Sequence, residues 1–523
     1  MKRVVGAVVG AVLLATAAGA PREAAAQELD QLVWGACDAS GKVTHAEAAA
    51  DTPRSRASDS TGLVVECASL KVPLDYADPD RTISLALNRV RGRSSRGHLG
   101  ALLVNPGGPG ASGLDLAKRV AVQLPAELTG RFDVIGFDPR GVGNSEPALR
   151  CVDPAEYYAP PRPDNVPATT KQETVLLGRA RQYAQACQSR WSWMLPHLST
   201  ENNARDMDEI RKALGEERIS YLGYSYGTYL GAVYATLFPE RVRRMVLDSV
   251  VDPKGVWYSS NLAQDLAFNR RHRDFLRWTA RHNDVYRLGR TARLVSFAWY
   301  AMRDRLRTRP AGGVVGPSEL DDVYTLGGYS DLVWPQLAKA FSAYVKRGDT
   351  APLVAAYRRY AQNDAKDENE YAVYLGVQCR DVAWPGEWSK WRSDMTRMHA
   401  KAPFLTWSNA WYNAPCVYWP ERGGTPVTLR DSAKLPPIML VQSERDAATP
   451  YQGALSMRAV FARSRLLTVA GGNHGATFND NQCVDRKLAA YLRDGTLFGP
   501  ATRAAQRPDA RCAGSPEPLA ASR

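Results

Sequence analysis

Gly223-Tyr224-Ser225-Tyr226-Gly227 is the stretch that decides the fold of this 523-residue chain. The apolar residues 219–222 before it predict a short buried strand, and residues 228–238 after it predict a helix. A serine between two glycines at a strand-to-helix turn is typical of a nucleophile on a sharp bend, where the neighbours need little or no side chain. The alternative is a glycine-rich turn with a bystander serine. The partners described below favour Ser225 as a nucleophile.

Similar apolar runs recur on both sides of this turn and alternate with helical segments. Strands are expected within 63–67, 83–87, 101–105, 132–137, 245–247, 438–441 and 466–469, and helices over 201–215 and 451–461. Buried strands that alternate with helices predict an α/β protein with a mostly parallel, doubly wound sheet. With the G-x-S-x-G turn inside such a sheet, the prediction becomes the α/β-hydrolase fold.

The alternation of predicted strands and helices stops between Pro253 and about Leu435. This stretch contains ten of the thirteen tryptophans. A structureless loop of this length is implausible inside a compact domain, so we expect a large, mainly helical lid with its own core. The predicted organisation is a first part of the core over 27–253, the lid over 254–435 and a second part of the core over 436–523.

The N-terminus has the features of a secretory signal peptide. Lys2 and Arg3 precede an apolar run from Val4 to Ala20, and small residues follow up to Ala26. This run is short for a membrane span, and the small residues suit a cleavage site, so residues 1–26 are predicted to be removed. We expect a secreted, extracellular protein that is not held in a membrane after cleavage.

Eight cysteines agree with export, because an even number in a secreted chain favours disulfides. They fall in four sequential couples, which predicts pairing between neighbours: Cys37 with Cys67, Cys151 with Cys187, Cys379 with Cys416, and Cys483 with Cys512. No CxxC or Cys/His spacing of a zinc site is present, so no metal is expected.

The formal charge of +13 raises the question of nucleic-acid binding. The basic residues are spread along the chain and mixed with acids, and the densest group, over 269–293, carries apolar residues at helical spacing. A solvated helix face accounts for this group better than a polyanion site does, so no nucleic-acid partner is expected.

A nucleophilic serine needs a base and an acid that orients the base, and in this fold they follow the serine in the order acid, then histidine. His474 lies in a glycine-rich loop directly after the final predicted strand, whereas His272, His282 and His399 lie in the lid. We therefore predict His474 as the base.

The acid is expected in the loop after the strand at 438–441. Asp446 is the preferred candidate, because the loop must run a few residues past the strand to reach His474. Glu444 in the same loop and Asp248 after the preceding strand are the alternatives.

The tetrahedral intermediate needs two backbone N–H donors for its oxyanion. Tyr226, the residue after the nucleophile, supplies one, and the glycine-rich stretch 105–110 after an earlier strand supplies the other. Gly108 is preferred to Gly107, and Pro109 has no N–H to donate. The stretch lacks the lysine and the glycine spacing of a phosphate-binding loop.

With these motifs, the chain resembles the serine peptidases related to proline iminopeptidases, and more closely the secreted bacterial tripeptidyl aminopeptidases. The motifs are Asn105-Pro106-Gly107-Gly108-Pro109-Gly110, Asp138-Pro139-Arg140-Gly141-Val142-Gly143-Asn144-Ser145, residues 223–231, residues 443–450 and His474-Gly475. Iminopeptidases usually carry a His before the Gly-Gly-Pro-Gly, where this chain has Asn105-Pro106, and this difference favours the tripeptidyl branch. The resemblance implies release of short peptides from the free N-terminus of peptide substrates, without a cofactor.

Such an exopeptidase must hold the substrate ammonium group about three residue lengths, roughly 10 Å, from the nucleophile. A carboxylate from the lid would do this. The acid-rich segment 364–370 and the turn 379–381 that follows it supply three candidates, Glu368, Glu370 and Asp381. A secreted carboxylesterase or lipase would share the triad and lack the amine anchor. It remains the alternative, together with a simple proline iminopeptidase.

Overall fold

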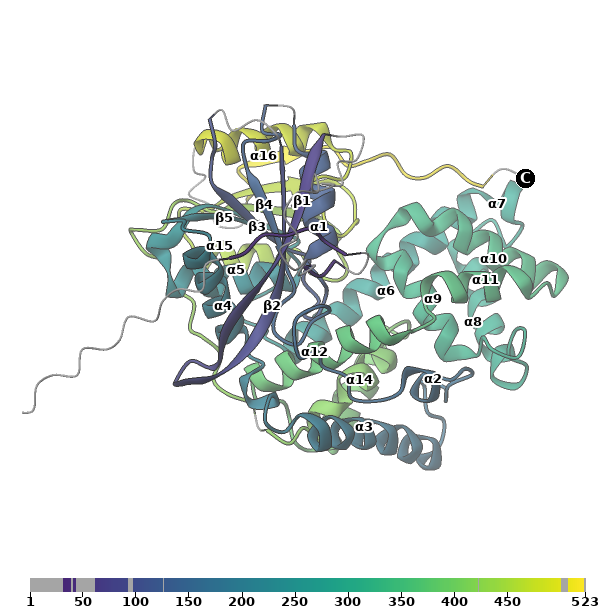
Figure 1. Ribbon diagram of the computed structural model, residues 1–523. Helices are drawn as coiled ribbons and strands as arrows, with labels where there is room; N and C mark the ends of the chain where they lie inside the picture. The colour runs from purple at the N-terminus through teal and green to yellow at the C-terminus, as the bar shows by residue number, and fades with distance from the viewer. Residues whose placement is uncertain are drawn as a thin grey trace, which may run out of the picture.

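The computed structural model describes residues 32–38, 41–43, 62–92, 97–125, 127–421, 423–499 and 507–521. The predicted signal peptide, residues 1–26, lies outside these ranges. Within them, one nine-stranded sheet forms the centre of one part of the molecule (Figure 1), with the strand order β1-β2-β4-β3-β5-β6-β7-β8-β9. The strands are β1 (Leu63–Asp75), β2 (Asp78–Gly92), β3 (Ala101–Asn105), β4 (Asp133–Phe137), β5 (Ile219–Tyr224), β6 (Val242–Asp248), β7 (Met439–Ser443), β8 (Arg465–Val469) and β9 (Ala510–Cys512).

The sheet is parallel from β4 onward, and only β1 and β2 run antiparallel to their neighbours. The mostly parallel sheet is therefore confirmed. The short final strand β9, which pairs with β8, was not predicted, because three residues carry no recognisable periodicity.

Helices cover both faces of the sheet, as strands that are buried on both sides require. On one face, Leu102, Val104 and Leu222 pack in a cluster with residues of α1 (Leu114–Gln123) and α16 (Gln482–Asp494). On the other face, Leu103 and Tyr221 pack with residues of α4 (Thr200–Ala213), α5 (Tyr226–Leu237) and α15 (Gln452–Val460). Successive side chains along each strand point to opposite faces of the sheet, so each strand contributes to two separate layers of the hydrophobic core.

A helical region lies between β6 and β7 and forms a lobe beside the sheet (Figure 1). Its own core contains Phe275, Trp278, Trp299 and Trp334, all buried. Its helices are α6 (Tyr258–Arg281), α7 (Asn283–Tyr286), α8 (Ala292–Thr308), α9 (Pro317–Tyr329), α10 (Trp334–Arg347), α11 (Ala351–Tyr360), α12 (Ala365–Asp381), α13 (Trp388–His399) and α14 (Thr406–Asn413). The helical insertion into the sheet domain is confirmed, and the limits 254 and 435 remain a prediction.

A second segment, between β4 and β5, packs against this lid. It contains α2 (Pro154–Tyr157) and α3 (Thr170–Trp191). Arg162 makes an ion pair with Glu319 of α9 at 2.9 Å, and Asp164 makes one with Arg303 of α8 at 2.7 Å. The lid is thus built from two separate stretches of the chain. Sequence reasoning recognised only the second stretch, because the first lies among predicted core elements.

The basic stretch 269–293 is a solvated helix face only in part. Arg271 is 2% exposed, makes an ion pair with Asp331 at 3.0 Å and lies over the ring of Trp334 at 4.6 Å. His272 is buried and stacks on Phe404 with ring centroids 4.0 Å apart. Charged and titratable residues of this stretch, Arg271 and His272 among them, therefore belong to the interior of the lid, which the charge pattern did not indicate.

Candidate active site

Ser225 lies between the end of β5 and the start of α5, in a conformation with φ 54° and ψ −124° that is costly for any residue with a side chain. Its N–H donates to the carbonyl of Asp248 on the neighbouring strand, at 3.1 Å. The flanking glycines are needed for space: a Cβ on Gly223 would come within 2.4 Å of the Gly227 carbonyl. The half-buried serine is thus presented on a turn that packing holds in place.

The loop after β3 lies directly against this turn. A Cβ on Gly107 would lie 2.9 Å from Cβ of Ser225 and 3.0 Å from the N atom of Tyr226. The Gly107 N–H already donates to Oδ1 of Asn105 at 3.0 Å. Within the described part of the chain, the N–H groups of Gly108 and Tyr226 donate to no protein acceptor. These two donors are therefore available to a ligand, which supports the preference for Gly108 over Gly107.

His474 and Asp446 come together at the carboxyl edge of the sheet. Nδ1 of His474 lies 3.0 Å and 2.9 Å from the two carboxylate oxygens of Asp446. Asp446, 2% exposed, also accepts hydrogen bonds from the N–H groups of Ala448 and Thr449 and from the Thr449 hydroxyl, each at 3.0 Å. The backbone N–H of His474 donates to the carbonyl of Tyr329 in the lid at 2.8 Å. The imidazole is therefore fixed by both halves of the molecule, with Nδ1 engaged and Nε2 left for a reacting group.

The pKa of His474 reflects two opposed influences. Burial lowers this pKa, because it disfavours the imidazolium. The nearby carboxylate of Asp446, with a further contribution from Asp248, outweighs burial and raises the pKa above its ordinary value. A raised pKa suits a group that must accept a proton near neutral pH.

The alternatives to these two residues are placed elsewhere. Asp248 accepts hydrogen bonds from the N–H groups of Ala476 and Thr477 and from the Thr477 hydroxyl, so it holds the loop that follows His474. Glu444 pairs with Arg511. His272 is in the lid core, where burial lowers its pKa to about 3.

A cavity of about 440 Å³ opens onto Ser225, Tyr226 and Gly108. Its outer wall comes from lid helices α6, α9, α12 and α14. Aromatic rings make up much of this wall: Trp257, Phe268, Tyr329, Tyr374 and Tyr412. The size is within the range of small-molecule and peptide sites.

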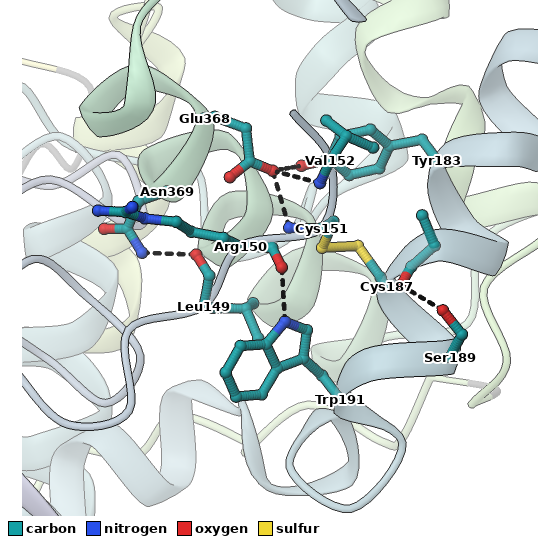
Figure 2. Close-up of a disulfide and its surroundings, with 11 residues drawn as sticks. Leu149, Arg150, Cys151, Val152, Tyr183, Cys187, Ser189, Trp191, Glu368 and Asn369 are labelled. Carbon is teal, nitrogen blue, oxygen red and sulfur yellow. Dashed lines mark hydrogen bonds between the residues drawn. A yellow bond between two sulfur atoms is a disulfide. The ribbon is translucent and has the colours of Figure 1, made fainter. Parts of the chain in front are cut away.

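Glu368 points away from this cavity. Figure 2 shows its carboxylate directed at the segment that carries the Cys151–Cys187 disulfide. It accepts hydrogen bonds from the N–H groups of Cys151 at 2.9 Å and Val152 at 3.3 Å, and from the Tyr183 hydroxyl at 3.0 Å. Glu368 therefore joins α12 to the segment between β4 and β5, and it does not line the cavity.

Asp381, at the other end of α12, is also fully engaged inside the protein. It accepts hydrogen bonds from the N–H of Thr200 at 2.7 Å, from the Thr200 hydroxyl at 2.6 Å and from Nε1 of Trp257 at 3.2 Å. Burial raises the pKa of Asp381 to about 6. It is not among the residues that line the cavity.

Glu370 is the one of the three predicted lid acids that lines the cavity with Ser225. Its side chain is half-buried and makes no hydrogen bond or ion pair to any described residue. Burial raises the pKa of Glu370, and the nearby Asp367 raises it further. The carboxylate is thus available to a cationic group of a ligand.

All four predicted disulfides are present, with Cys37 bonded to Cys67, Cys151 to Cys187, Cys379 to Cys416, and Cys483 to Cys512. In the described ranges, no three His, Cys, Asp or Glu side chains are grouped in a way that would hold a metal ion. None of the helices in those ranges is both long and apolar enough to cross a membrane.

Sequence reasoning missed Thr449, which binds Asp446 and lies 3.4 Å from Nδ1 of His474. The D-x-x-T spacing within 446–449 is the signal that could have found it, because an Asp side chain commonly accepts from groups two and three residues later.

Comparison with known proteins agrees with this geometry. Residues 100–480 match the model of the alpha/beta hydrolase fold family. The chain is 45% identical over 441 residues to a tripeptidyl aminopeptidase of Streptomyces coelicolor, covering 82% of this chain and 81% of that protein. It is 31% identical to the serine protease Hip1 of Mycobacterium tuberculosis, with 82% and 85% of the two chains covered, and 34% identical to a carboxylesterase B of the same species, with 82% and 84% covered. The chain therefore belongs to the α/β-hydrolase family, in the group of serine hydrolases that contains the Streptomyces tripeptidyl aminopeptidases.

Proposed function

We propose that this protein is a secreted serine exopeptidase that releases short peptides, preferentially tripeptides, from the free N-terminus of peptide substrates. The observation that carries the proposal is the unpaired carboxylate of Glu370 in the same cavity as Ser225. The Streptomyces relative, named a tripeptidyl aminopeptidase, supports it.

The chemistry follows from the groups around Ser225. The Ser225 hydroxyl attacks the scissile carbonyl while Nε2 of His474 takes its proton, and Asp446 holds the ring by Nδ1 and stabilises the imidazolium. The N–H groups of Tyr226 and Gly108 stabilise the oxyanion. His474 then protonates the leaving amine, and water hydrolyses the acyl-enzyme by the same route.

Glu370 is the proposed anchor for the substrate's terminal ammonium. A half-buried carboxylate without a partner gains most from a cation, because pairing offsets the cost of burying its charge. Three extended residues span about 10 Å between the amine and the scissile carbonyl. The aromatic wall suits the side chains of these residues without demanding one particular charge.

A carboxylesterase is the second candidate. One relative bears the name carboxylesterase B, and the aromatic wall would also accept an apolar acyl group. This activity needs no amine anchor, so it leaves the unpaired Glu370 without a role.

Secretion is part of the proposal. The signal-peptide pattern of residues 1–26 and the four disulfides support it, since disulfides persist in oxidising compartments.

One set of substrates tests the function. Tripeptide anilides with a free and an acetylated N-terminus are compared with one- and two-residue anilides and with a simple acyl ester. We expect the free tripeptide to be cleaved at least about a hundredfold faster than its acetylated form, because acetylation removes the cation. Equal rates for the free and acetylated tripeptides, or a preference for the ester, would assign the protein to the esterases.

A further inference from the structure

A second cavity, of about 860 Å³, lies on the other side of Glu370. It is bounded by described residues near the Cys37–Cys67 disulfide (Cys37, Asp38, Gly41 and Val65), by the loops after β3 and β4 and by the first turns of α12. Residues in its wall include Cys37, Gly110, Ser112, Asn144, Lys366 and Asn369. Neither the three residues assigned to proton transfer and attack (Ser225, His474 and Asp446) nor the two oxyanion donors line this cavity.

Glu370 is the residue that the two cavities have in common. The loop after β3 also separates them, since Gly108 and Pro109 line the first and Gly110 lines the second. A Cβ on Gly110 would lie 2.3 Å from the carbonyl oxygen of Glu370, so the two backbones are in direct contact. Because Glu370 lines both cavities and its backbone contacts Gly110, this residue lies at the boundary between them.

The backbone of α12 is held firmly at this point. The two residues before Glu370 bind the segment between β4 and β5 (Figure 2): Glu368 holds Cys151 and Val152, and Asn369 donates to the carbonyls of Gly141 and Leu149 at 2.8 Å and 2.7 Å. The helix backbone is therefore fixed at this boundary, and the Glu370 side chain is the part of it that a substitution removes.

We propose that the side chain of Glu370 is a partition that limits the length of the released peptide, and that the second cavity is a latent binding site for residues N-terminal to the tripeptide. This inference rests on the proposed exopeptidase function. It assigns to Glu370 a steric role in addition to its charge, and to the second cavity a ligand class, an extended peptide segment.

The two roles of Glu370 oppose a longer substrate in different ways. A substrate chain that continues past the ammonium-binding position clashes with the side-chain atoms of Glu370. It also lacks a terminal ammonium at this position, so the Glu370 carboxylate stays buried without a cation. Glu370→Gln removes the charge and keeps the size, whereas Glu370→Ala removes both. This matched pair separates sterics from electrostatics.

The test uses the purified full-length protein and two peptides with the same scissile bond, one with a free N-terminus three residues away and one extended by two residues and acetylated. Both variants should lose most activity on the free tripeptide. Glu370→Ala should cleave the extended peptide at least about tenfold faster than Glu370→Gln and the wild type do. Mass spectrometry of a long peptide should then show products longer than tripeptides with Glu370→Ala alone.

A second substitution locates the extension. Lys366 is exposed and lines the second cavity but not the first. Lys366→Trp in the Glu370→Ala background should abolish the gain, whereas Lys339→Trp on α10, which lines neither cavity, should preserve it.

The failures of the two proposals are distinguishable. If the wild type prefers free over acetylated tripeptide and the two Glu370 variants treat the extended peptide alike, the partition is wrong and the exopeptidase stands. If the gain survives Lys366→Trp, the extension does not bind in the second cavity. If the wild type shows no preference for a free amine, the proposed function itself fails.

Discussion

The carboxyl edge of the sheet and helix α12 both carry candidate carboxylates for the site, but they place them by different means. At the sheet edge, Asp248 ends β6 and Asp446 follows the adjacent strand β7, so topology alone brings both acids close to the serine turn. On α12, neighbouring acids diverge, because each residue turns the side chain by about 100°.

The consequence is clearest for the three acids of α12. Glu368 and Glu370, two residues apart, lie about 200° apart around the helix, and they face the segment between β4 and β5 and the cavity, respectively. Asp381 lies eleven residues after Glu370 and returns to nearly the same side, but about 16 Å further along the axis. There it binds Thr200 and Trp257. At a strand edge, chain order limits the candidate acids to the few that follow successive strands, whereas on a helix the packed neighbours decide which acid faces the cavity.

The largest expected effect is at the serine on the sheet edge. Ser225→Ala should lower kcat on a tripeptide anilide by about a millionfold, because loss of a triad nucleophile removes the covalent route. Circular dichroism and the melting temperature should show a folded protein. Ser259→Ala, at an exposed position in the same cavity, is the control and should stay within a few-fold of the wild type. More than about a percent of residual activity in Ser225→Ala would reject the nucleophile.

Next in size is the contrast between the two sheet-edge acids. Asp446→Asn should reduce kcat about ten-thousandfold, because the amide no longer fixes the required tautomer of His474. Asp248→Asn should act chiefly on stability, through the hydrogen bonds of Ala476 and Thr477, and leave much more activity. Steady-state kinetics and thermal unfolding of both variants measure the contrast. The reverse order of activities would move the orienting role to Asp248.

A smaller effect is expected on α12. Glu370→Gln should lower kcat/KM on the free tripeptide by about a hundredfold and leave the acetylated peptide unchanged, since only the free amine loses a partner. Glu368→Gln is the matched control on the same helix. This substitution should reduce the melting temperature, because it weakens the three hydrogen bonds that the Glu368 carboxylate accepts. It should leave the ratio of kcat/KM between the free and the acetylated peptide unchanged. A change of that ratio in Glu368→Gln and not in Glu370→Gln would place the anchor elsewhere.

The smallest effect is on the pH profile. The reaction needs neutral His474, and the pKa of His474 is raised by Asp446, so kcat/KM should fall as the pH drops through a midpoint above about 6.5. In Asp446→Asn the residual activity should have a lower midpoint, because only the smaller contribution of Asp248 then opposes the effect of burial on the imidazole pKa. Profiles of kcat/KM from pH 5 to 9 report both midpoints. Coincident midpoints would show that another group controls the acidic limb.

Many features of the sheet and its carboxyl edge could be predicted from the sequence. The strand predicted over 101–105 has these bounds, the other predicted strands overlap the observed ones, and the cysteine couples are bonded as their spacing indicated. The features of the lid that were not predicted from the sequence have a common cause. The α2–α3 segment joins the lid, and Arg271 with His272 enters its core, through contacts between residues far apart in sequence. The local periodicity of apolar and polar residues does not indicate contacts of this kind.

The sequence by itself predicted the serine turn and the candidate nucleophile, acid and base in their chain order, and it identified the family. These features depend on local backbone geometry and on the connection of successive strands, which short motifs encode. Only the tertiary structure decided which acid of α12 reaches the cavity, which of the two adjacent glycines keeps a free N–H, and that a second cavity lies behind Glu370. Each of these features depends on which hydrogen-bonding groups already have partners from distant parts of the chain, and on which spaces other side chains already fill. These contacts form when the local elements pack together, so a local stretch of sequence does not specify them.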